Sequence, residues 1–191
     1  KVKNGSGVKA AKVLVATNGY TDDFYPNLKK TIINANSFQV ATEPVPESIR
    51  KTILPEGHVS SDARNLLLYY RFDHTGRLLM GGRGSFAEPT QPSEWAHLEG
   101  AIAKLFPQAK DIPIQYRWCG HVAITRDFMP HLHEPAPGLR MDIGCQGRGV
   151  GLQSRMGIAL ADYLATGNAA ALPVPLTRIA PIPFFGLRRL Y

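Results

Sequence analysis

Long hydrophobic runs, cysteine and a signal peptide are what this sequence most clearly lacks. No run approaches the roughly 18 apolar residues of a membrane helix, so we expect no membrane partner. The only cysteines, Cys119 and Cys145, form no C-x-x-C pair, which argues against a disulfide framework and indicates free thiols of the reducing cytoplasm. The chain opens at Lys1 without methionine or an apolar leader, and an absent signal decides little in such a chain.

Basic charge is in excess, but it is scattered. The net charge of +7 is spread over isolated pairs such as Lys29-Lys30 and Arg188-Arg189. Proteins that bind single-stranded nucleic acid interleave such charges with stacking aromatic residues. Because that pattern is missing, we interpret the charge as a solvated surface and expect no nucleic-acid partner.

The composition is sufficient for a folded core. The chain has 191 residues, 44% of them hydrophobic, which suits one ordinary domain or two pieces of larger ones. Near its start, Asn4-Gly5 predicts a hairpin over residues 2–12. The apolar run 12–17 then predicts a short buried strand, which Asn18-Gly19 ends.

The middle of the chain alternates apolar and polar residues, as half-buried strands do. Asp73-His74-Thr75-Gly76 predicts a four-residue hairpin turn between two of these strands. A helix is expected from Trp95 to Leu105, with Ser93 as its N-cap and Pro107 as its stop. The predicted strands cover residues 37–42, 66–72, 77–82 and 112–125, the last of which breaks at Gly120.

From Leu139 the pattern changes. Residues 139–143 predict a strand, which is followed by the loop Gly144 to Gly151 (GCQGRGVG) and by an amphipathic helix that Gly167 ends. The prolines at positions 173, 175, 181 and 183 argue against any regular element beyond it. We therefore expect residues 171–191 to lie over the surface.

The glycine-rich loop is the most informative motif. Glycines at a strand-to-helix junction let the backbone approach a flat or anionic ligand, toward which the helix N–H groups and dipole point. A tight structural turn that needs glycine for positive φ explains the spacing equally well. Gly5 to Ala10 fits G-x-G-x-x-A, but polar residues precede it and no helix pattern follows, so it is not a dinucleotide fingerprint.

Histidines offer a weaker signal. His131 and His133 could present two imidazoles to a metal ion, with His121 as a third ligand. The neighbouring prolines 130 and 135 indicate an irregular loop that fixes no ligand geometry. We expect no metal site.

Five stretches follow one another in the order of a known family: VLVATNGY at 13–20, ATEP at 41–44, GGR at 81–83, WCGHVAITRDFMP at 118–130, and residues 144–167. Together they resemble the D-amino-acid-oxidase-like superfamily of FAD-dependent oxidoreductases, especially its gamma-glutamylputrescine oxidase branch. The resemblance spans nearly the whole chain, which makes it far more specific than any single motif.

The resemblance implies an α+β fold in two parts. An antiparallel-sheet substrate domain would cover residues 20–138, and the C-terminal strands and helix of a Rossmann-like FAD-binding domain would cover residues 1–19 and 139–170. A proline-rich tail, 171–191, would follow. Members carry the dinucleotide fingerprint in an N-terminal half that this sequence lacks. We therefore expect the chain to need that half, or a self-associated copy, as a partner.

The resemblance also implies site residues. The loop would lie along the pyrimidine edge of the flavin, and Thr17-Asn18-Gly19 would end a strand near the cofactor. FAD should be non-covalent, because Val122 to Ile124 occupy the stretch where sarcosine-oxidase relatives carry their attaching cysteine. Relatives often have Gly-His-Gly where this chain has Gly-Arg-Gly. The cofactor-binding candidates are Thr17, Asn18, Gly19, Gly120, Gly147, Arg148, Gly149, Val150, Gly151 and Leu152.

The substrate side is less defined. Tyr69, Tyr70 and Trp118 are candidates for an aromatic wall around an amine, with Arg83 beside them, although core packing suits these aromatic residues equally well. Amino-acid oxidases of the superfamily commonly place an arginine shortly after Trp-x-Gly, where this chain has Val122 and Ala123. That departure favours an amine substrate. No catalytic residue is identified.

The resemblance implies oxidation of a C–N bond by hydride transfer to flavin. We expect this portion to be inactive alone, because it lacks the fingerprint that binds the FAD pyrophosphate. The alternative is a non-catalytic binding or assembly subunit of a split flavoenzyme.

Overall fold

The computed structural model describes residues 5–190, with side chains to Leu187, and the chain forms two compact units. Unit 1 combines Lys1–Asn34 with Val122–Tyr191, and unit 2 is the continuous segment Ala35–His121 between them. Strands and helices mix as α+β, which confirms the predicted fold class. Within the described residues, no helix is both long and apolar enough to cross a membrane.

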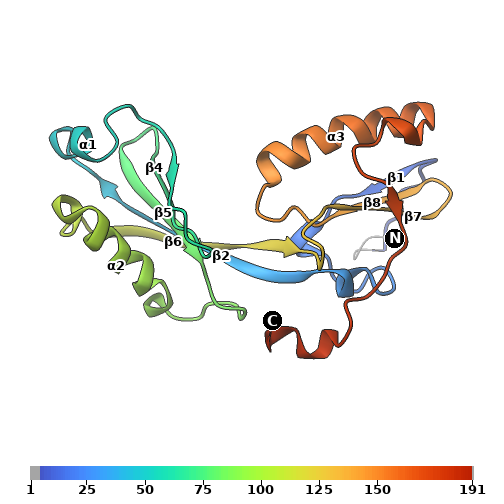
Figure 1. Cartoon of the computed structure of the whole chain (residues 1–191), viewed down its shortest axis with the longest axis horizontal. Helices are drawn as coiled ribbons and strands as arrows, with labels where there is room; N and C mark the ends of the chain where they lie inside the picture. The colour runs from blue at the N-terminus through green and yellow to red at the C-terminus, as the bar shows by residue number, and fades with distance from the viewer. Residues whose placement is uncertain (1–4, 191) are drawn as a thin grey trace. The chain divides into compact units, whose positions relative to one another are not determined.

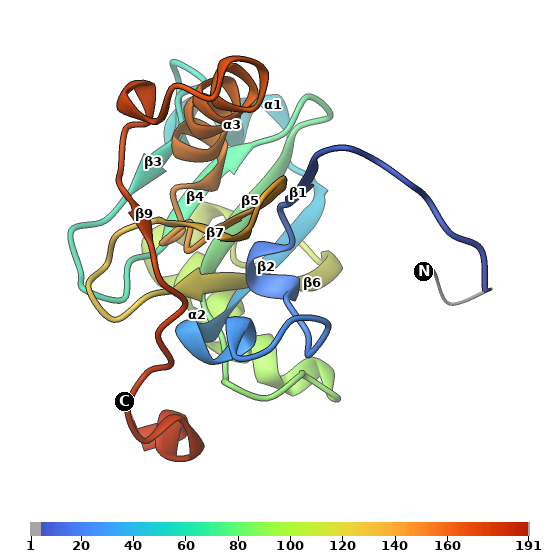
Figure 2. The ribbon, with the colours of Figure 1, turned by 90° about the vertical axis from the view of Figure 1, so that its right-hand side faces the viewer.

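Unit 1 is built on a four-stranded sheet, in the order β1-β8-β7-β9. β1 (Val13–Val15) runs parallel to β8 (Leu139–Ile143), with Val13 opposite Leu139. β7 (His131–Ala136) pairs antiparallel with β8, and β9 (Leu176–Thr177) lies parallel to β7 (Figure 2). The first and last parts of the chain therefore share one sheet, as the resemblance predicts.

The alternation of side chains along β8 separates two small cores in unit 1. Met141 and Ile143 pack on one face with Leu28, Ile32 and Ala123. The opposite face is covered by α3 (Gly149–Thr166), whose Met156 and Leu160 pack against Leu132 of β7 (Figure 1). Gly167 ends α3 with φ of 76° and donates its N–H to the Tyr163 carbonyl oxygen, which confirms the predicted C-cap.

Unit 2 is based on the second sheet, whose order is β3-β4-β5-β2-β6. The Asp73 carboxylate accepts hydrogen bonds from the Thr75 and Arg77 N–H groups, and Gly76 takes φ of 85°, which closes the predicted hairpin between β4 and β5. The strands are β2 (Ile33–Pro44), β3 (Ser60–Ser61), β4 (Tyr69–Phe72), β5 (Arg77–Arg83) and β6 (Ile114–Ile124).

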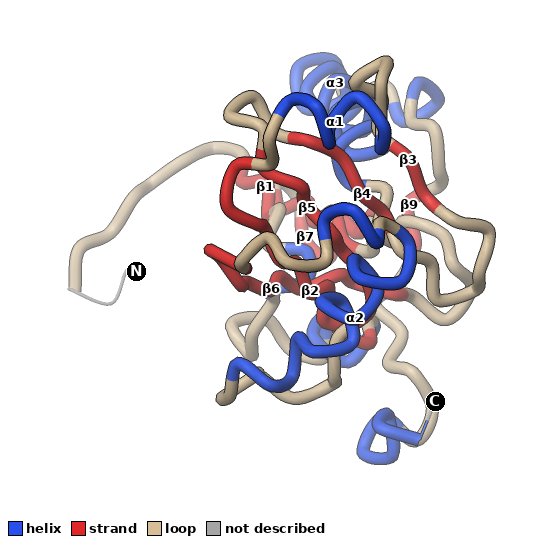
Figure 3. The backbone as a smooth tube through the Cα atoms, turned by 90° about the vertical axis from the view of Figure 1, so that its left-hand side faces the viewer, coloured by secondary structure: helices blue, strands red, loops and turns tan. Residues whose placement is uncertain are grey.

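Two helices pack on one face of this sheet, α1 (Glu47–Ile53) and α2 (Ala96–Leu105) (Figure 3). Leu98 and Ile102 of α2 join the core of unit 2, which Phe38, Val40, Leu78 and Met80 build from the strands. The short 3-10 segments of the chain are Asn18–Tyr20, Leu28–Thr31, Pro92–Trp95, Pro107–Ala109, Ala169–Ala171 and Phe185–Leu190.

Three expectations about the ordinary elements are wrong. The predicted hairpin at Asn4 falls partly outside the described residues, and residues 5–12 form no strand. Val8, the apolar residue of this segment that a strand would bury, is 87% exposed. Ser93 does not cap α2, since a 3-10 turn starting at Pro92 precedes the helix and Gln91 with Glu94 forms the capping box. β6 continues through Gly120, because pairing within the sheet keeps that backbone extended.

Two further expectations fail at prolines. The tail forms the two-residue strand β9 directly after Pro175. Neither Leu176 nor Thr177 is a proline, so both can pair with β7. Residues 131–136 are a strand and not an irregular loop. Pro130 lies just before that strand, and Pro135 falls where its register to β8 shifts.

Candidate functional site

The glycine-rich loop leaves β8 at Gly144 with an unusual backbone. Gly144, Gln146 and Gly147 take φ values of 93°, 53° and 75°. At Gly144 a Cβ atom would lie 2.5 Å from the Thr125 Cγ2 atom, so no side chain fits there. Gln146 holds the left-handed conformation without being glycine, which requires support from its surroundings.

One support comes from the end of β1. The Asn18 Oδ1 atom accepts hydrogen bonds from the N–H groups of Gly144 at 3.0 Å and Cys145 at 3.2 Å. Thr17 bonds Thr21 through the two hydroxyl groups, and the Gly19 oxygen accepts from the Asn34 amide. The structure thus brings the predicted Thr17-Asn18-Gly19 segment to the loop, with Asn18 making the contact.

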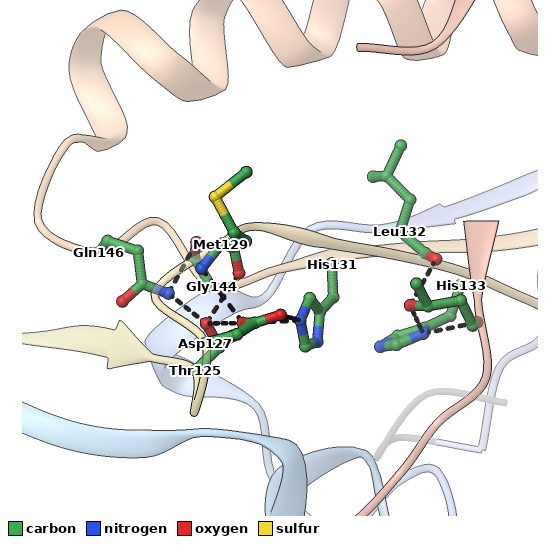
Figure 4. A network of polar contacts seen from close by, with 9 residues as sticks. Thr125, Asp127, Met129, His131, Leu132, His133, Gly144 and Gln146 are labelled. Carbon is green, nitrogen blue, oxygen red and sulfur yellow. Dashed lines mark hydrogen bonds and ion pairs between the residues drawn. The ribbon is translucent and has the colours of Figure 1, made fainter. Parts of the chain in front are cut away.

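A second support is a polar network behind the loop (Figure 4). The Gln146 side chain donates to the Thr125 hydroxyl at 2.7 Å, and its backbone N–H donates to the Ala123 oxygen at 3.1 Å. Thr125 lies within donating distance of the Met129 oxygen and of Asp127. Asp127 in turn bonds the His131 Nε2 atom at 3.0 Å.

The network favours the ionised form of Asp127. Burial raises the pKa of Asp127, but hydrogen bonds from His131, the Met129 N–H and Thr125 outweigh it, so the pKa lies below its ordinary value. Our sequence analysis assigned no role to Thr125, Asp127 or Gln146. The available signal was Thr-x-Asp directly after a strand, a combination typical of side-chain-bonded turns.

The start of α3 is open to a ligand. Arg148 occupies the N-cap without any side-chain capping bond, and its side chain is exposed. The first-turn amides of a helix have no acceptor inside it and carry the positive end of its dipole. Val150 is 93% exposed, and a Cβ at Gly151 would meet nothing within 4 Å. The predicted Gly147–Leu152 segment therefore presents backbone with little side-chain cover.

Asp142 lies on the other side of this junction, two residues before Gly144. It faces α3 and is only 8% exposed. Burial raises the pKa of Asp142 to about 6, and the nearby Gln153 amide lowers it in part. Asp142 Oδ1 and Gln153 Nε2 nevertheless have no hydrogen bond of normal geometry among the described residues.

In unit 2, Tyr69 and Tyr70 have different environments. The Tyr69 hydroxyl bonds Ser37, and its ring lies over Gly81, where a Cβ would come within 2.0 Å of it. Tyr70 packs against the core and meets Phe106 edge to face at 5.1 Å. Tyr70 therefore serves the core, whereas Tyr69 stays a substrate candidate.

Arg83 lies on the same face of the sheet as Tyr69, because it is the cross-strand partner of Ser37, which bonds the Tyr69 hydroxyl. The Arg83 guanidinium lies 4.9 Å from the centre of the Phe86 ring. Trp118 is 40% exposed, and its carbonyl oxygen accepts from the Trp95 indole at 3.1 Å. Gly120 is a half-buried position of β6.

The histidines are engaged in hydrogen bonds. His121 bonds Asn36 and Glu88, both at 2.8 Å, and His133 bonds the Thr177 oxygen at 2.9 Å. In the part of the chain that the structure describes, no three His, Cys, Asp or Glu side chains are grouped as metal ligands would be.

A glycine loop between a parallel-paired strand and a helix without a side-chain cap is typical of α+β proteins that bind a flat or anionic cofactor. The comparison with protein families agrees, because the family described as FAD dependent oxidoreductase (DAO) matches residues 1–163. The chain belongs to this family.

Curated relatives match over nearly the whole chain. It is 32% identical to a probable oxidoreductase OrdL of Rhizobium meliloti, over 93% of the chain and 40% of the relative. It is 29% identical to the gamma-glutamylputrescine oxidoreductase of Escherichia coli, over 100% of the chain and 47% of the relative. The chain thus spans less than half the length of these relatives.

Solved structures share the fold. Fructosyl amine:oxygen oxidoreductase (Amadoriase I) of Aspergillus fumigatus superposes with a TM-score of 0.70 at 14% identity, over 99% of this chain and 46% of that one. Glycine oxidase of Bacillus cereus superposes with a TM-score of 0.62 at 17% identity, over 81% of this chain and 42% of that one.

Proposed function

We propose that this chain forms part of an FAD-dependent oxidoreductase that oxidises the C–N bond of a small amine or amino acid. The glycine loop and the open start of α3 carry the proposal. Gly147 and Gly151 present bare backbone, and no side chain among the described residues caps the helix. These features fit the edge of a flavin, which needs close approach and hydrogen-bond donors.

Each part of the loop has a distinct role toward the cofactor. Bound FAD would supply the hydride acceptor. The backbone of Gly147–Leu152 would lie along the flavin edge and donate to it from amides other than those of Arg148 and Leu152, which already donate to the Cys145 and Arg148 oxygens. The positive end of α3 would stabilise negative charge on the reduced flavin. Asn18 and Thr125 would hold the loop in place from behind, through the contacts to Gly144 and Gln146.

On the substrate side we propose an amine. Val122 and Ala123 supply no guanidinium to clamp a carboxylate, and Tyr69, Arg83 and Trp118 offer aromatic and polar surface. The name of the Escherichia coli relative points in the same direction.

We assign the FAD-binding part to residues 1–19 and 139–170, the substrate domain to residues 20–138, and a tail to residues 171–191. The compact units divide elsewhere, since residues 20–34 and 122–138 belong to unit 1. Thr125 and Asp127 explain this difference, because they support the glycine loop from within the second of these segments.

Flavin binding should be non-covalent. Val122, Ala123 and Ile124 have no nucleophilic side chain. Acid precipitation of the flavin-loaded protein should therefore release all the yellow colour into the supernatant. Colour retained in the pellet would contradict the proposal.

The main test adds FAD to the chain alone and to the chain joined to a segment carrying the dinucleotide fingerprint. After desalting, the visible spectrum reports bound flavin, and bleaching on amine addition reports turnover. We expect both signals only in the joined protein, because the pyrophosphate and ribose contacts come from the fingerprint.

Three other outcomes are informative. Stoichiometric flavin and bleaching in the chain alone would refute the expectation that it is inactive by itself. Flavin without bleaching by any amine or amino acid in the joined protein would favour the binding or assembly subunit. No flavin in either sample would refute the proposed function.

A further inference from the structure

Asp142 is a buried acid without a counter-ion among the described residues. Its strand neighbours Met141 and Ile143 pack into the core on one face of β8, so Asp142 faces α3. Leu132, directly opposite Asp142 in β7, packs against Met156 and Leu160 of that helix.

The charged groups around Asp142 are already paired with one another. Arg140, two residues earlier on the same face, bonds Glu134 of β7 at 2.7 Å and lies over the Tyr163 ring of α3. Tyr163 also donates its hydroxyl to Glu134. β1 contributes only Val13, Leu14 and Val15, and α3 contributes the neutral Gln153.

The position of Asp142 connects this charge with the glycine loop. Gln153 is the fifth residue of α3, and its amide lowers the pKa of Asp142 in part, which places the carboxyl near the second turn of the helix, one turn from its start. The positive end of a helix dipole acts within its first turn and corresponds to about half a unit charge. Two anions that use the same helix end weaken each other, and low dielectric strengthens that repulsion.

We propose that Asp142 is a positioning residue whose charge controls how strongly the start of α3 stabilises an anionic reduced flavin. This inference rests on the proposed function. When Asp142 is protonated, the positive end of α3 stabilises only the anionic flavin. When Asp142 is ionised, its negative charge weakens that stabilisation. Burial supports the switch, because it raises the pKa of Asp142 to about 6.

The experiment measures the midpoint potential of the flavin bound to the joined protein, with and without the Asp142→Asn substitution. At pH 8 the variant should favour reduced flavin about tenfold more, which for a two-electron couple raises the potential by about 30 mV. At pH 5, where Asp142 is protonated, the two potentials should coincide. Equal differences at both pH values would overturn the inference.

A matched control removes a charge from the same helix. Asp162 is exposed near the far end of α3, and Asp162→Asn should leave the potential unchanged at both pH values. An equal effect of Asp162→Asn would attribute the shift to net charge and overturn the inference.

A second measurement needs no variant. Coupling between two sites is reciprocal, so reducing the flavin with dithionite should raise the titration midpoint of the Asp142 carboxyl, followed by ¹³C NMR, by about one pH unit. An unchanged midpoint would refute the coupling while leaving flavin binding intact. Absence of bound flavin from both the joined protein and the chain alone would instead refute the proposed function.

Discussion

Replacing Gly144 by alanine tests the geometry of the loop most directly. The new Cβ would lie 2.5 Å from Thr125 Cγ2, and φ of 93° is unfavourable for any L-residue with a side chain. The left-handed backbone costs about 1–2 kcal/mol, and forcing an extra methyl into a packed site costs about 1–3 kcal/mol. Gly144→Ala should therefore lower the free energy of unfolding by about 2–5 kcal/mol.

Two other glycines separate these contributions. Gly147 has φ of 75°, but a Cβ there would meet Val122 at an ordinary 3.8 Å, so Gly147→Ala should cost only the backbone term of about 1–2 kcal/mol. Gly157 lies inside α3, and a methyl group there would meet nothing within 4 Å, so Gly157→Ala should stabilise by about 0.5–1 kcal/mol.

Urea unfolding followed by circular dichroism gives the three free energies. The expected order of stability is Gly157→Ala, wild type, Gly147→Ala, Gly144→Ala. A Gly144→Ala variant as stable as Gly147→Ala would show that Thr125 does not confine the loop. A neutral effect at both positions would refute the positive φ values themselves.

Three further predictions concern Asp142, Asn18 and Tyr69. Because burial raises the pKa of Asp142 from 3.8 to about 6, the wild type should lose about 2–3 kcal/mol relative to Asp142→Asn as pH rises from 4 to 8; a constant difference in urea unfolding would refute this. Asn18→Ala should leave two loop amides unbonded, cost about 1–3 kcal/mol and speed hydrogen exchange at Gly144 and Cys145; unchanged exchange would exclude the contact. Gly81→Ala should displace the Tyr69 ring and lower the free energy of unfolding by about 1–3 kcal/mol. If Gly81→Ala and Tyr69→Ala show no coupling energy in a double-mutant cycle, the Tyr69 ring does not pack on Gly81.

The sequence predicted elements whose signals are local. The hairpin at Asp73–Gly76, the strand 139–143 and the Gly167 cap each depend on residues that are adjacent in the chain. The same applies to the glycine loop, because the hydrophobic pattern alone predicts the apolar strand before it and the amphipathic helix after it. The placement of β1 and β8 in one sheet came from family resemblance, because no local pattern indicates a partner so distant in sequence, and their direct parallel pairing was not predicted.

Contacts between distant segments explain the remaining differences. Gly120 predicts a strand break from sequence alone, but β6 continues through it because β6 pairs within the sheet. The prolines of the tail predict no strand, but β9 forms because its residues pair with β7. The support of Gln146 by Thr125 depends on a fold that brings the end of β6 behind the loop. The separation of Tyr69 from Tyr70 depends on which face of β4 the helices cover.

The division of unit 1 into two chain segments limits when its sheet can form during synthesis. Unit 2 is continuous, so all of its residues have been made before β8 is translated. β1 is made before unit 2 and its described partner β8 after it, so Val13 and Leu14 remain without that partner until unit 2 has been made. Such distant pairings form slowly and leave edges exposed while they form. The continuous unit can therefore close before the strand that leads into the glycine loop has been made.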